Sequence, residues 1–212
     1  MNDAAGDSTV HVVEDDSDLR RSMRWMLQKA GLDVECHDSA EAFLEKFEPE
    51  NSACVVLDMR MSGMSGLELQ QRLIDQDWHT PIVFVTGHAD VPMAVQAMEA
   101  GAAAFIEKPF ERAHLLSHVQ NAIRQHHRHR RQLLQRQRSE SRLRTLTPRE
   151  REIMEMAVAG KTTKEIAFHL DLSVRTIEKH RERIMMKTQS KSITHLVALA
   201  IQCGMRKDIL TA

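Results

Sequence analysis

Cysteine is scarce in this sequence, and its three residues, Cys36, Cys54 and Cys203, lie far apart. A disulfide framework needs paired cysteines, and a cysteine-based zinc site needs closely spaced ones, so the sequence argues against both. We expect the three side chains to pack as small apolar residues.

Long apolar runs are absent as well. Runs such as residues 53–57 and 81–85 have the length of strands and fall far short of the roughly 20 residues that span a bilayer. The first residues also lack the basic start and apolar stretch of a signal peptide. We therefore expect a cytoplasmic protein without a membrane partner.

Glycine and proline are few, with 8 and 5 residues in a chain of 212. Since 42% of the residues are hydrophobic and 28% are charged, the composition is typical of folded domains rather than of a disordered chain. The length suits two small domains, because domains commonly contain roughly 100–200 residues.

Neither sign of charge dominates the chain, whose formal net charge is −1, but its two parts differ strongly. Residues 1–122 contain 9 Lys and Arg against 21 Asp and Glu, a net charge of −12. Residues 123–212 contain 20 against 9, a net charge of +11. This asymmetry indicates an acidic module joined to a module that binds a polyanion.

Five cycles of a short apolar run and a helical pattern make up the first 122 residues. The expected strands are residues 9–13, 33–36, 53–57, 82–85 and 104–106. The expected helices are residues 18–30, 41–48, 67–75, 91–100 and 112–124. Gly31 and Gly101 suit the left-handed position after a helix, and Asp38 to Glu41 has the spacing of a capping box. The pattern predicts an α/β domain with a doubly wound parallel sheet, a (βα)5 fold.

Residues 123–145 are rich in Gln, Arg and His and contain no Gly or Pro. They are predicted to form a helical linker that continues the fifth helix, with Leu133 and Leu134 on a narrow apolar stripe. A solvated helix fits better than a strong coiled coil, because clean heptads are missing. His126, His127 and His129 have no acidic or cysteine co-ligand close in sequence, so we do not expect a metal site there.

Residues 146–212 are predicted to form an all-α domain. Thr147 with Glu150 and Thr162 with Glu165 have the spacing of capping boxes, and Pro148 suits the first position of a helix. Four helices fit residues 148–159, 163–170, 174–188 and 192–203, with no strand pattern between them.

Five residues of types used in phosphoryl transfer lie at or just after the carboxyl ends of four expected strands. Doubly wound sheets bind their ligands at this edge. The five residues are Glu14, Asp15, Asp58, Thr86 and Lys108. Asp58 would attack a phosphoryl group in line, and Glu14 and Asp15 would join it in offering hard oxygens to Mg²⁺. Lys108 would neutralise charge on the transferring group, and Thr86 would hydrogen-bond the aspartyl phosphate. Any one of these residues alone could be a helix cap, a solvated charge or an ordinary strand residue.

Four stretches of this part resemble receiver domains of the FixJ type. They are V-H-V-V-E-D-D from Val10, V-V-L-D-M-R-M-S-G-M-S-G from Val55, V-T-G-H-A-D-V-P-M-A-V from Val85 and F-I-E-K-P-F from Phe105. The resemblance implies that Asp58 is the phosphoacceptor and that Arg60 lends a backbone carbonyl to the metal. It also implies that Thr86 and Phe105 couple phosphorylation to the surface, and that the Lys108–Pro109 peptide is cis.

Two residues depart from the family pattern. Ser62 stands where the family usually has Pro, so the loop behind the phosphoacceptor is expected to be less rigid. Glu14 stands where Asp is common. Neither change removes the expected chemistry.

The segment from Leu146 resembles the helix-turn-helix of the LuxR/NarL/FixJ family, through T-P-R-E-R-E, A-G-K-T-T-K-E-I-A and R-T-I-E-K-H. Ile166, Ala167, Leu170, Leu172, Ile177 and Ile184 have the spacing of its core. Arg175, Glu178, Lys179, Arg181 and Glu182 are left for the major groove, unless they form only a solvated basic face. By family position, Glu178, Lys179 and Glu182 face base edges, and Lys164, Ser173, Thr176 and Arg183 bind phosphates.

Two features of this segment are unusual. Glu178 and Glu182 are odd on a DNA-binding face unless a glutamate accepts a hydrogen bond from cytosine. Asp171 replaces the glycine usual at this turn, although Asp tolerates left-handed geometry better than most residues.

The favoured interpretation is a two-component response regulator, not an enzyme beyond at most weak autophosphatase activity. A sensor histidine kinase would phosphorylate Asp58, and homodimerisation would place two helix-turn-helix units on double-stranded DNA, with RNA polymerase as a further partner. One alternative is a DNA-binding dimer that ignores phosphate. A metal-dependent phosphohydrolase fits poorly, because the other part of the chain is basic and no substrate-binding module is visible.

Overall fold

The computed structural model describes residues 9–87 and 91–204 of the chain. The chain divides into two compact units, Met1–His129 and Arg130–Ala212. Within the described ranges, every helix is too short or too polar to cross a membrane.

The first unit is built on a five-stranded parallel sheet with the order β2-β1-β3-β4-β5. Its strands are β1 (Thr9–Val13), β2 (Val34–His37), β3 (Ser52–Asp58), β4 (Ile82–Thr86) and β5 (Ala104–Glu107). All seven residues of the central strand β3 are buried, because helices cover both faces of the sheet. The predicted (βα)5 fold is confirmed.

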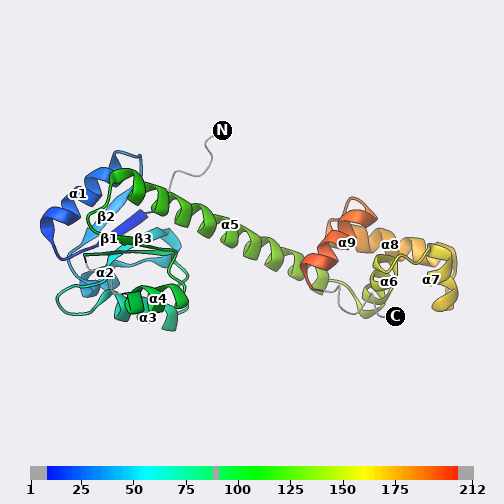
Figure 1. The fold of residues 1–212 in the computed structure, drawn as a ribbon. Helices are drawn as coiled ribbons and strands as arrows, with labels where there is room; N and C mark the ends of the chain where they lie inside the picture. The colour runs from blue at the N-terminus through cyan, green and yellow to red at the C-terminus, as the bar shows by residue number, and fades with distance from the viewer. Residues whose placement is uncertain (1–8, 88–90, 205–212) are drawn as a thin grey trace. The chain divides into compact units, whose positions relative to one another are not determined.

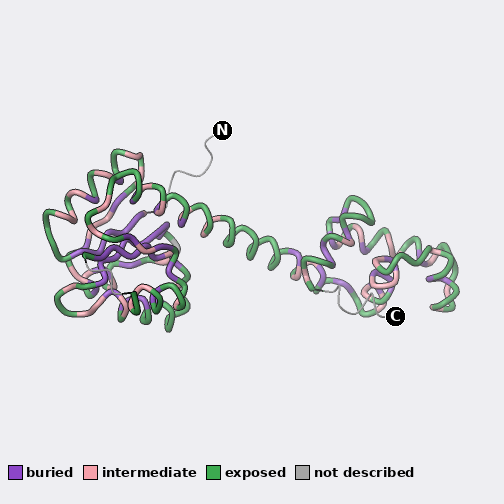
Figure 2. The backbone as a smooth tube through the Cα atoms, viewed as in Figure 1, coloured by how far each residue is buried: buried purple, intermediate pink, exposed green. Residues whose placement is uncertain are grey.

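The helices of this unit form two layers (Figure 1). They are α1 (Ser17–Gln28), α2 (Ala40–Lys46), α3 (Gly66–Asp75), α4 (Val91–Glu99) and the first part of α5 (Arg112–Arg144). On one face, α1 and α5 bury Met23, Leu27, Leu115 and Val119 against the sheet. On the other face, α2, α3 and α4 bury a second apolar cluster around Phe43 and Phe84. Figure 2 shows the resulting buried sheet between exposed outer helix surfaces.

Helix boundaries near α2 differ from the sequence prediction. The predicted capping box at Asp38 is wrong, because the extended Ser39 caps the helix and its hydroxyl accepts from Ala42 N at 3.2 Å. The helix also ends before residue 48, and a 3₁₀ turn (Pro49–Asn51) follows. Since Pro49 disfavours helical geometry at the residue before it, Glu48 is extended. Gly31 and Gly101 have the predicted left-handed conformation.

Residues 123–144 are helical, as predicted, and belong to α5. Leu133 and Leu134 are exposed on it, whereas Ser139 and Leu143 near its end are buried in the second unit. The second unit also contains α6 (Pro148–Val158), α7 (Thr163–His169), α8 (Val174–Thr188) and α9 (Ile193–Gln202). Both predicted capping boxes are present, at the starts of α6 and α7. Asp171 is left-handed, with φ of 53°.

A buried ion pair joins α6 to α8. Glu150 is only 3% exposed, and Lys187 Nζ lies 2.6 Å from its Oε2. The hydrogen bond from Lys187 lowers the pKa of Glu150 below its usual range. The same carboxylate accepts from Thr147 N at 2.9 Å, which completes the capping box of α6. One side chain therefore caps α6 and positions the end of α8, with Ile177 and Ile184 facing the shared core.

Gly66 allows α3 to begin close to the end of β3. Its amide donates to Met59 O at 3.1 Å. A Cβ at this position would lie 2.4 Å from Asp58 O and 3.0 Å from the ring of Phe84, and backbone cannot move aside cheaply.

We expect Gly66→Ala to lower the free energy of unfolding by about 1–3 kcal/mol, because the added methyl group overpacks this contact. Gly87→Ala is the matched control, since a Cβ there meets nothing within 4 Å. Urea denaturation followed by circular dichroism would measure both changes. Equal effects of the two substitutions would contradict the packing argument.

Candidate functional site

The acidic residues predicted from the sequence lie together at the carboxyl edge of the sheet. Glu14 follows β1 directly, and Asp58 is the last residue of the neighbouring strand β3. Carboxylate oxygens of Glu14, Asp15 and Asp58 all lie within 4.8 Å of one another. Their donor set is three hard carboxylates, the kind of ligand that Mg²⁺ prefers. The next acidic residue, Asp16, instead caps α1 by accepting from Asp18 N at 2.8 Å.

Lys108 joins two of these carboxylates. Its Nζ lies 2.8 Å from Glu14 Oε2 and 2.9 Å from Asp58 Oδ2. The Lys108–Pro109 peptide is cis, as predicted. Lys108 N also donates to the backbone oxygen of Thr86 at 2.7 Å, so the main chain of β4 positions the residue that carries the ammonium group.

Burial determines the electrostatics of this cluster. Desolvation raises the pKa of Glu14 to about 7, and the hydrogen bond from Lys108 opposes that shift. For Lys108, desolvation acts to lower the pKa, but hydrogen bonds to Glu14 and Asp58 and the charges of both carboxylates raise it overall. The ammonium group of Lys108 therefore stays charged at neutral pH beside Glu14 and Asp58. The cluster is therefore suited to bind a metal cation. It could also bind an anionic group that lies between this cation and Lys108.

Ser62 has a role that sequence reasoning missed. Its backbone N donates to Asp15 Oδ2 at 2.9 Å, and its hydroxyl lies 3.1 Å from the same oxygen. From the sequence, Ser62 was expected only to make the loop less rigid, because it stands where the family usually has proline. A proline has no amide hydrogen to donate, so the serine instead ties the loop after β3 to the acidic cluster. The sequence signal for this contact was a serine in place of proline, because serine has a backbone N–H and a hydroxyl that can both donate hydrogen bonds.

The other predicted residues of this unit lie around the cluster. Thr86 is buried and ends β4, next to the main chain of Lys108. Arg60 is exposed, and its amide donates to Asp58 Oδ1 at 3.3 Å. Phe105 is half-buried on β5, pairs in register with Phe84 and packs against the core below α4. Three apolar side chains of α4 are exposed at the surface beside β5: Val91, Val95 and Met98.

In the second unit, α7 and α8 are joined by a short turn, and α8 presents a charged surface. Its outward residues are exposed: Arg175, Glu178, Lys179, Glu182 and Arg183. Lys164 is exposed on α7. Ser173 caps α8 by accepting from Thr176 N at 3.1 Å, and the hydroxyls of Ser173 and Thr176 lie 2.8 Å apart.

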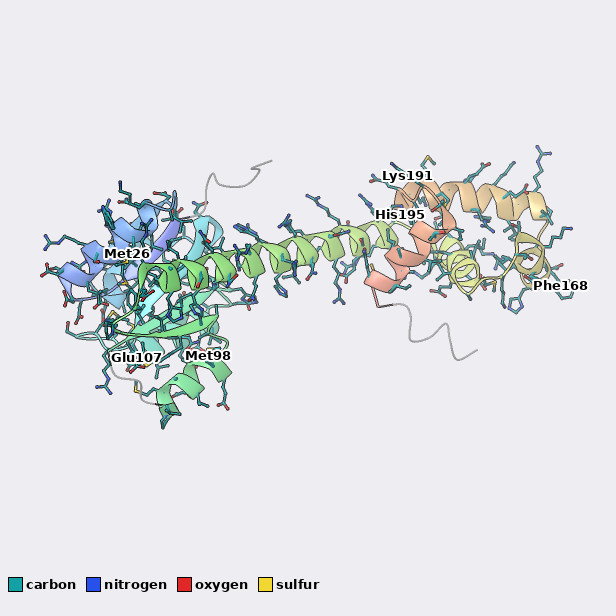
Figure 3. The ribbon with its side chains drawn as sticks, turned by 45° about the horizontal axis from the view of Figure 1, so that its top comes forward. Met26, Met98, Glu107, Phe168, Lys191 and His195 are labelled. Atoms are coloured by element: carbon teal, nitrogen blue, oxygen red, sulfur yellow. The ribbon has the colours of Figure 1, made fainter. Side chains whose placement is uncertain are left out.

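Arg181 lies differently from the other predicted DNA contacts. It is half-buried, and its guanidinium donates to Thr163 Oγ1 at 3.1 Å, which links α8 to the start of α7. Phe168, by contrast, is 92% exposed on α7 and points away from the helices (Figure 3). An exposed aromatic ring on α7 was not predicted from the sequence.

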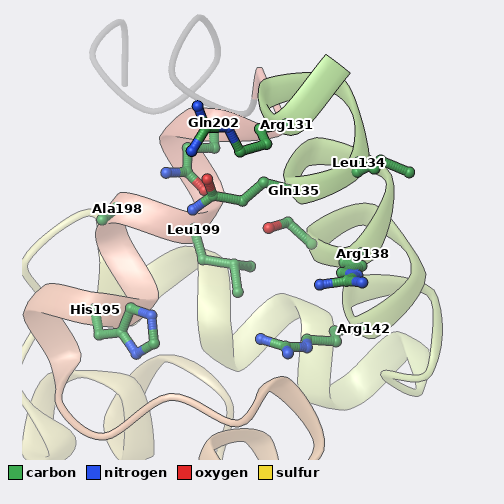
Figure 4. A pocket seen from close by; sticks show the side chains of 10 residues that line it. Arg131, Leu134, Gln135, Arg138, Arg142, His195, Ala198, Leu199 and Gln202 are labelled. Carbon is green, nitrogen blue, oxygen red and sulfur yellow. The ribbon is translucent and has the colours of Figure 1, made fainter. Parts of the chain in front are cut away.

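A basic groove of about 560 Å³ also lies in the second unit, between the last turns of α5 and α9 (Figure 4). Arg138 and Arg142 line it from α5, and His195 lines it from α9. No Asp or Glu is among its lining residues. The groove contains none of the predicted DNA contacts and is separate from the charged face of α8.

Comparison with protein families gives two matches. The family described as "Response regulator receiver domain" matches residues 10–120. The family described as "Bacterial regulatory proteins, luxR family" matches residues 144–200. Receiver domains with an acidic site of this kind typically bind Mg²⁺.

Individual relatives match nearly the whole chain. Transcriptional regulatory protein FixJ of Bradyrhizobium diazoefficiens is 42% identical over 199 residues, which are 94% of this chain and 97% of that protein. The solved structure of response regulator StyR has a TM-score of 0.83 and 40% identity, and covers 93% of this chain and 100% of its own. Full-length FixJ from B. japonicum has a TM-score of 0.60 and 42% identity, covering 93% and 98%.

The two family matches cover both units of the chain, and the full-length relatives contain both in one protein. The chain belongs to the two-component response regulators that join a receiver domain to a LuxR-type DNA-binding domain, and it is a transcriptional regulator rather than a conventional enzyme.

Proposed function

We propose that a sensor histidine kinase phosphorylates Asp58, and that phosphorylation promotes homodimerisation and sequence-specific binding to double-stranded DNA. The observation that carries the proposal is the position of Lys108, whose ammonium group bridges Asp58 and Glu14 at the carboxyl edge of the sheet. The protein acts in the cytoplasm, and any autophosphatase activity is weak. RNA polymerase is a further partner of the DNA-bound dimer.

The proposed domain limits follow the sequence. Residues 1–122 are the receiver, residues 123–145 the helical linker and residues 146–212 the DNA-binding domain. The two compact units divide at His129 and Arg130, inside the proposed linker.

The residues of the acidic cluster have separate duties in the reaction. Asp58 supplies the carboxylate oxygen that forms the bond to phosphorus, while the bond from phosphorus to the phosphorylated histidine of the kinase breaks and that histidine leaves. Glu14, Asp15, Asp58 and the backbone carbonyl of Arg60 are the groups that would hold Mg²⁺, which neutralises charge on the phosphoryl group when bound. Lys108 moves from the Asp58 carboxylate to a phosphoryl oxygen while its second hydrogen bond keeps it at Glu14.

Thr86 and Phe105 would transmit the change to the surface. The hydroxyl of Thr86 hydrogen-bonds the phosphoryl group, and Phe105 adjusts its packing beneath α4. The exposed apolar side chains of α4 support a dimer surface at this helix. A second copy of the receiver could bury these side chains and remove them from water. The dimer then presents two copies of α8 to paired half-sites.

Residues of α7 and α8 divide DNA recognition between them. Arg175, Glu178, Lys179 and Glu182 face base edges in the major groove. Lys164, Ser173, Thr176 and Arg183 bind phosphates, which adds affinity without sequence choice. Arg181 belongs to the residues proposed for the major groove, although its hydrogen bond to Thr163 also links α8 to the start of α7.

We expect Asp58→Asn to abolish labelling by acetyl phosphate in the presence of Mg²⁺, because the amide lacks the nucleophilic oxygen. Asp75→Asn is the control, since Asp75 is exposed at the end of α3 away from the cluster. Phosphate-affinity gel electrophoresis would measure the labelled fraction. Full labelling of the Asp58 variant would refute the assignment of the phosphoacceptor.

Lys108→Ala should still bind Mg²⁺ but lose the dimerisation response, because the carboxylates remain while the cation that follows the phosphoryl group is removed. Lys46→Ala, which removes an exposed lysine of α2, should respond normally. Analytical ultracentrifugation with and without a beryllofluoride phosphate mimic measures the response. A Lys108 variant that dimerises like the wild type would show that the lysine lacks this duty. If the mimic leaves the wild type unchanged in both oligomeric state and DNA affinity, the regulator ignores phosphate and the proposed function fails.

Two basic residues of α8 should respond differently to truncation. Lys179→Ala should weaken binding to the preferred site by about 1–3 kcal/mol and relax the preference at one base pair. Arg183→Ala should weaken specific and scrambled duplexes about equally and reduce the salt dependence by about one ion. Fluorescence anisotropy across several salt concentrations would measure both. Parallel losses for Lys179→Ala would identify it as a phosphate contact, and unchanged binding by both variants would exclude α8 as the recognition helix.

A further inference from the structure

A second cluster of ligand-bearing side chains lies on β1 and β2, apart from the phosphorylation site. His11 of β1 is paired in register with Glu35 of β2, and His37 lies two residues further along β2. Side chains alternate along a strand, so these three belong to the same face of the sheet. None of them has a role in the proposed phosphoryl transfer or DNA binding.

The ligand atoms of this cluster are close enough to share one ion. His11 Nδ1 lies 3.1 Å from His37 Nε2 and 4.0 Å from Glu35 Oε2. One ligand atom from each residue lies within 4.8 Å of the other two. In a tetrahedral site with metal–nitrogen distances of roughly 2.0–2.1 Å, two ligand atoms are separated by about 3.3 Å. The imidazoles already have nearly this separation, and a small rotation of the Glu35 side chain would bring its oxygen to the same distance.

Both histidines of the cluster are buried. His11 is 4% exposed and His37 is 3% exposed. Burial lowers the pKa of His11 to about 4, with a smaller contribution from His37. Burial also lowers the pKa of His37, while the nearby charge of Glu35 opposes that shift. The pair therefore belongs to the interior of the unit and not to its exposed surface.

Apolar rings enclose the cluster on one side, and Glu35 opens it on the other. The rings of Phe43 and Phe47 contact that of His11 edge-on, at centroid distances of 5.4 and 5.6 Å. The Glu35 side chain is 43% exposed, which leaves an approach for an ion from solvent and a position for a bound water. Two neutral imidazoles, one carboxylate and one open position form a typical ligand set for zinc.

We propose that His11, Glu35 and His37 bind a divalent transition-metal ion, with Zn²⁺ as the best chemical match, at a site distinct from the Mg²⁺ site. Imidazole nitrogens select Zn²⁺ and related ions over Mg²⁺, whose preferred ligands are oxygens. The two sets of ligands share no residue. Since β2 is an edge strand, the ion would fasten the edge of the sheet to β1.

The test uses the full-length chain in excess Mg²⁺, with His114→Ala and His118→Ala introduced as a background. That exposed pair on α5, with its Nε2 atoms 3.0 Å apart, could bind metal by itself. In this background, Zn²⁺ should bind in one equivalent by calorimetry and raise the melting temperature by roughly 5–10 °C at saturating concentrations. Co²⁺ should give the visible absorption of tetrahedral coordination without a thiolate charge-transfer band, which would exclude Cys36 as a ligand.

Adding Glu35→Gln to the background should weaken Zn²⁺ binding by about 10-fold or more, because a charged ligand is lost at a half-exposed position. Adding His11→Gln and His37→Gln should abolish it, with circular dichroism checking the fold. Asp38→Asn, an exposed carboxylate one residue after β2, is the matched control and should leave the affinity unchanged. The proposal is wrong if the background chain does not bind Zn²⁺, because His11 and His37 then share only an imidazole–imidazole hydrogen bond. It is also wrong if Glu35→Gln binds Zn²⁺ as tightly as the background, or if the Co²⁺ spectrum is octahedral, because the ion is then held by other ligands.

Discussion

Parallel pairing of the strands is the constraint on which the receiver site depends. Because all five strands run in the same direction, residues that end β1, β3 and β4 meet at one edge although they are far apart in sequence. The sheet therefore gathers several carboxylates in a partly buried space, and that arrangement is electrostatically unfavourable without a cation. Lys108 supplies one positive charge to Glu14 and Asp58, and the remaining negative charge accounts for the affinity of such sites for a divalent ion.

The same edge also shows how a local substitution can be compensated. Ser62 replaces a residue that would stiffen the loop after β3, and its amide and hydroxyl both reach Asp15. Gly66 then permits α3 to start against the backbone of Asp58, where a side chain would collide. The proposed phosphoacceptor, Asp58, is thus placed by the close approach of the α3 backbone, and its carboxylate faces Lys108.

The DNA-binding unit relies on a different principle, in which polar caps set the limits of short helices. Thr147 with Glu150 and Thr162 with Glu165 satisfy backbone amides at two helix starts. Glu150 also pairs with Lys187, so a local cap becomes a tertiary contact between α6 and α8. The buried face of α8 is apolar and its opposite face is charged, which orients the charged residues toward a partner outside the unit.

The sequence by itself determined the alternation of strands and helices, the two capping boxes of the second unit and the five residues of the proposed phosphorylation site, because periodicity, cap spacing and strand ends are local properties. It missed the Ser39 cap, where competing polar residues are adjacent, and the early end of α2 before Pro49. Only the tertiary structure decided which distant side chains meet: Ser62 with Asp15, Arg181 with Thr163, and His11 with Glu35 and His37. Strand register and helix packing bring these atoms within hydrogen-bonding or ligand distance, and neither register nor packing is written in the spacing of residues along one segment.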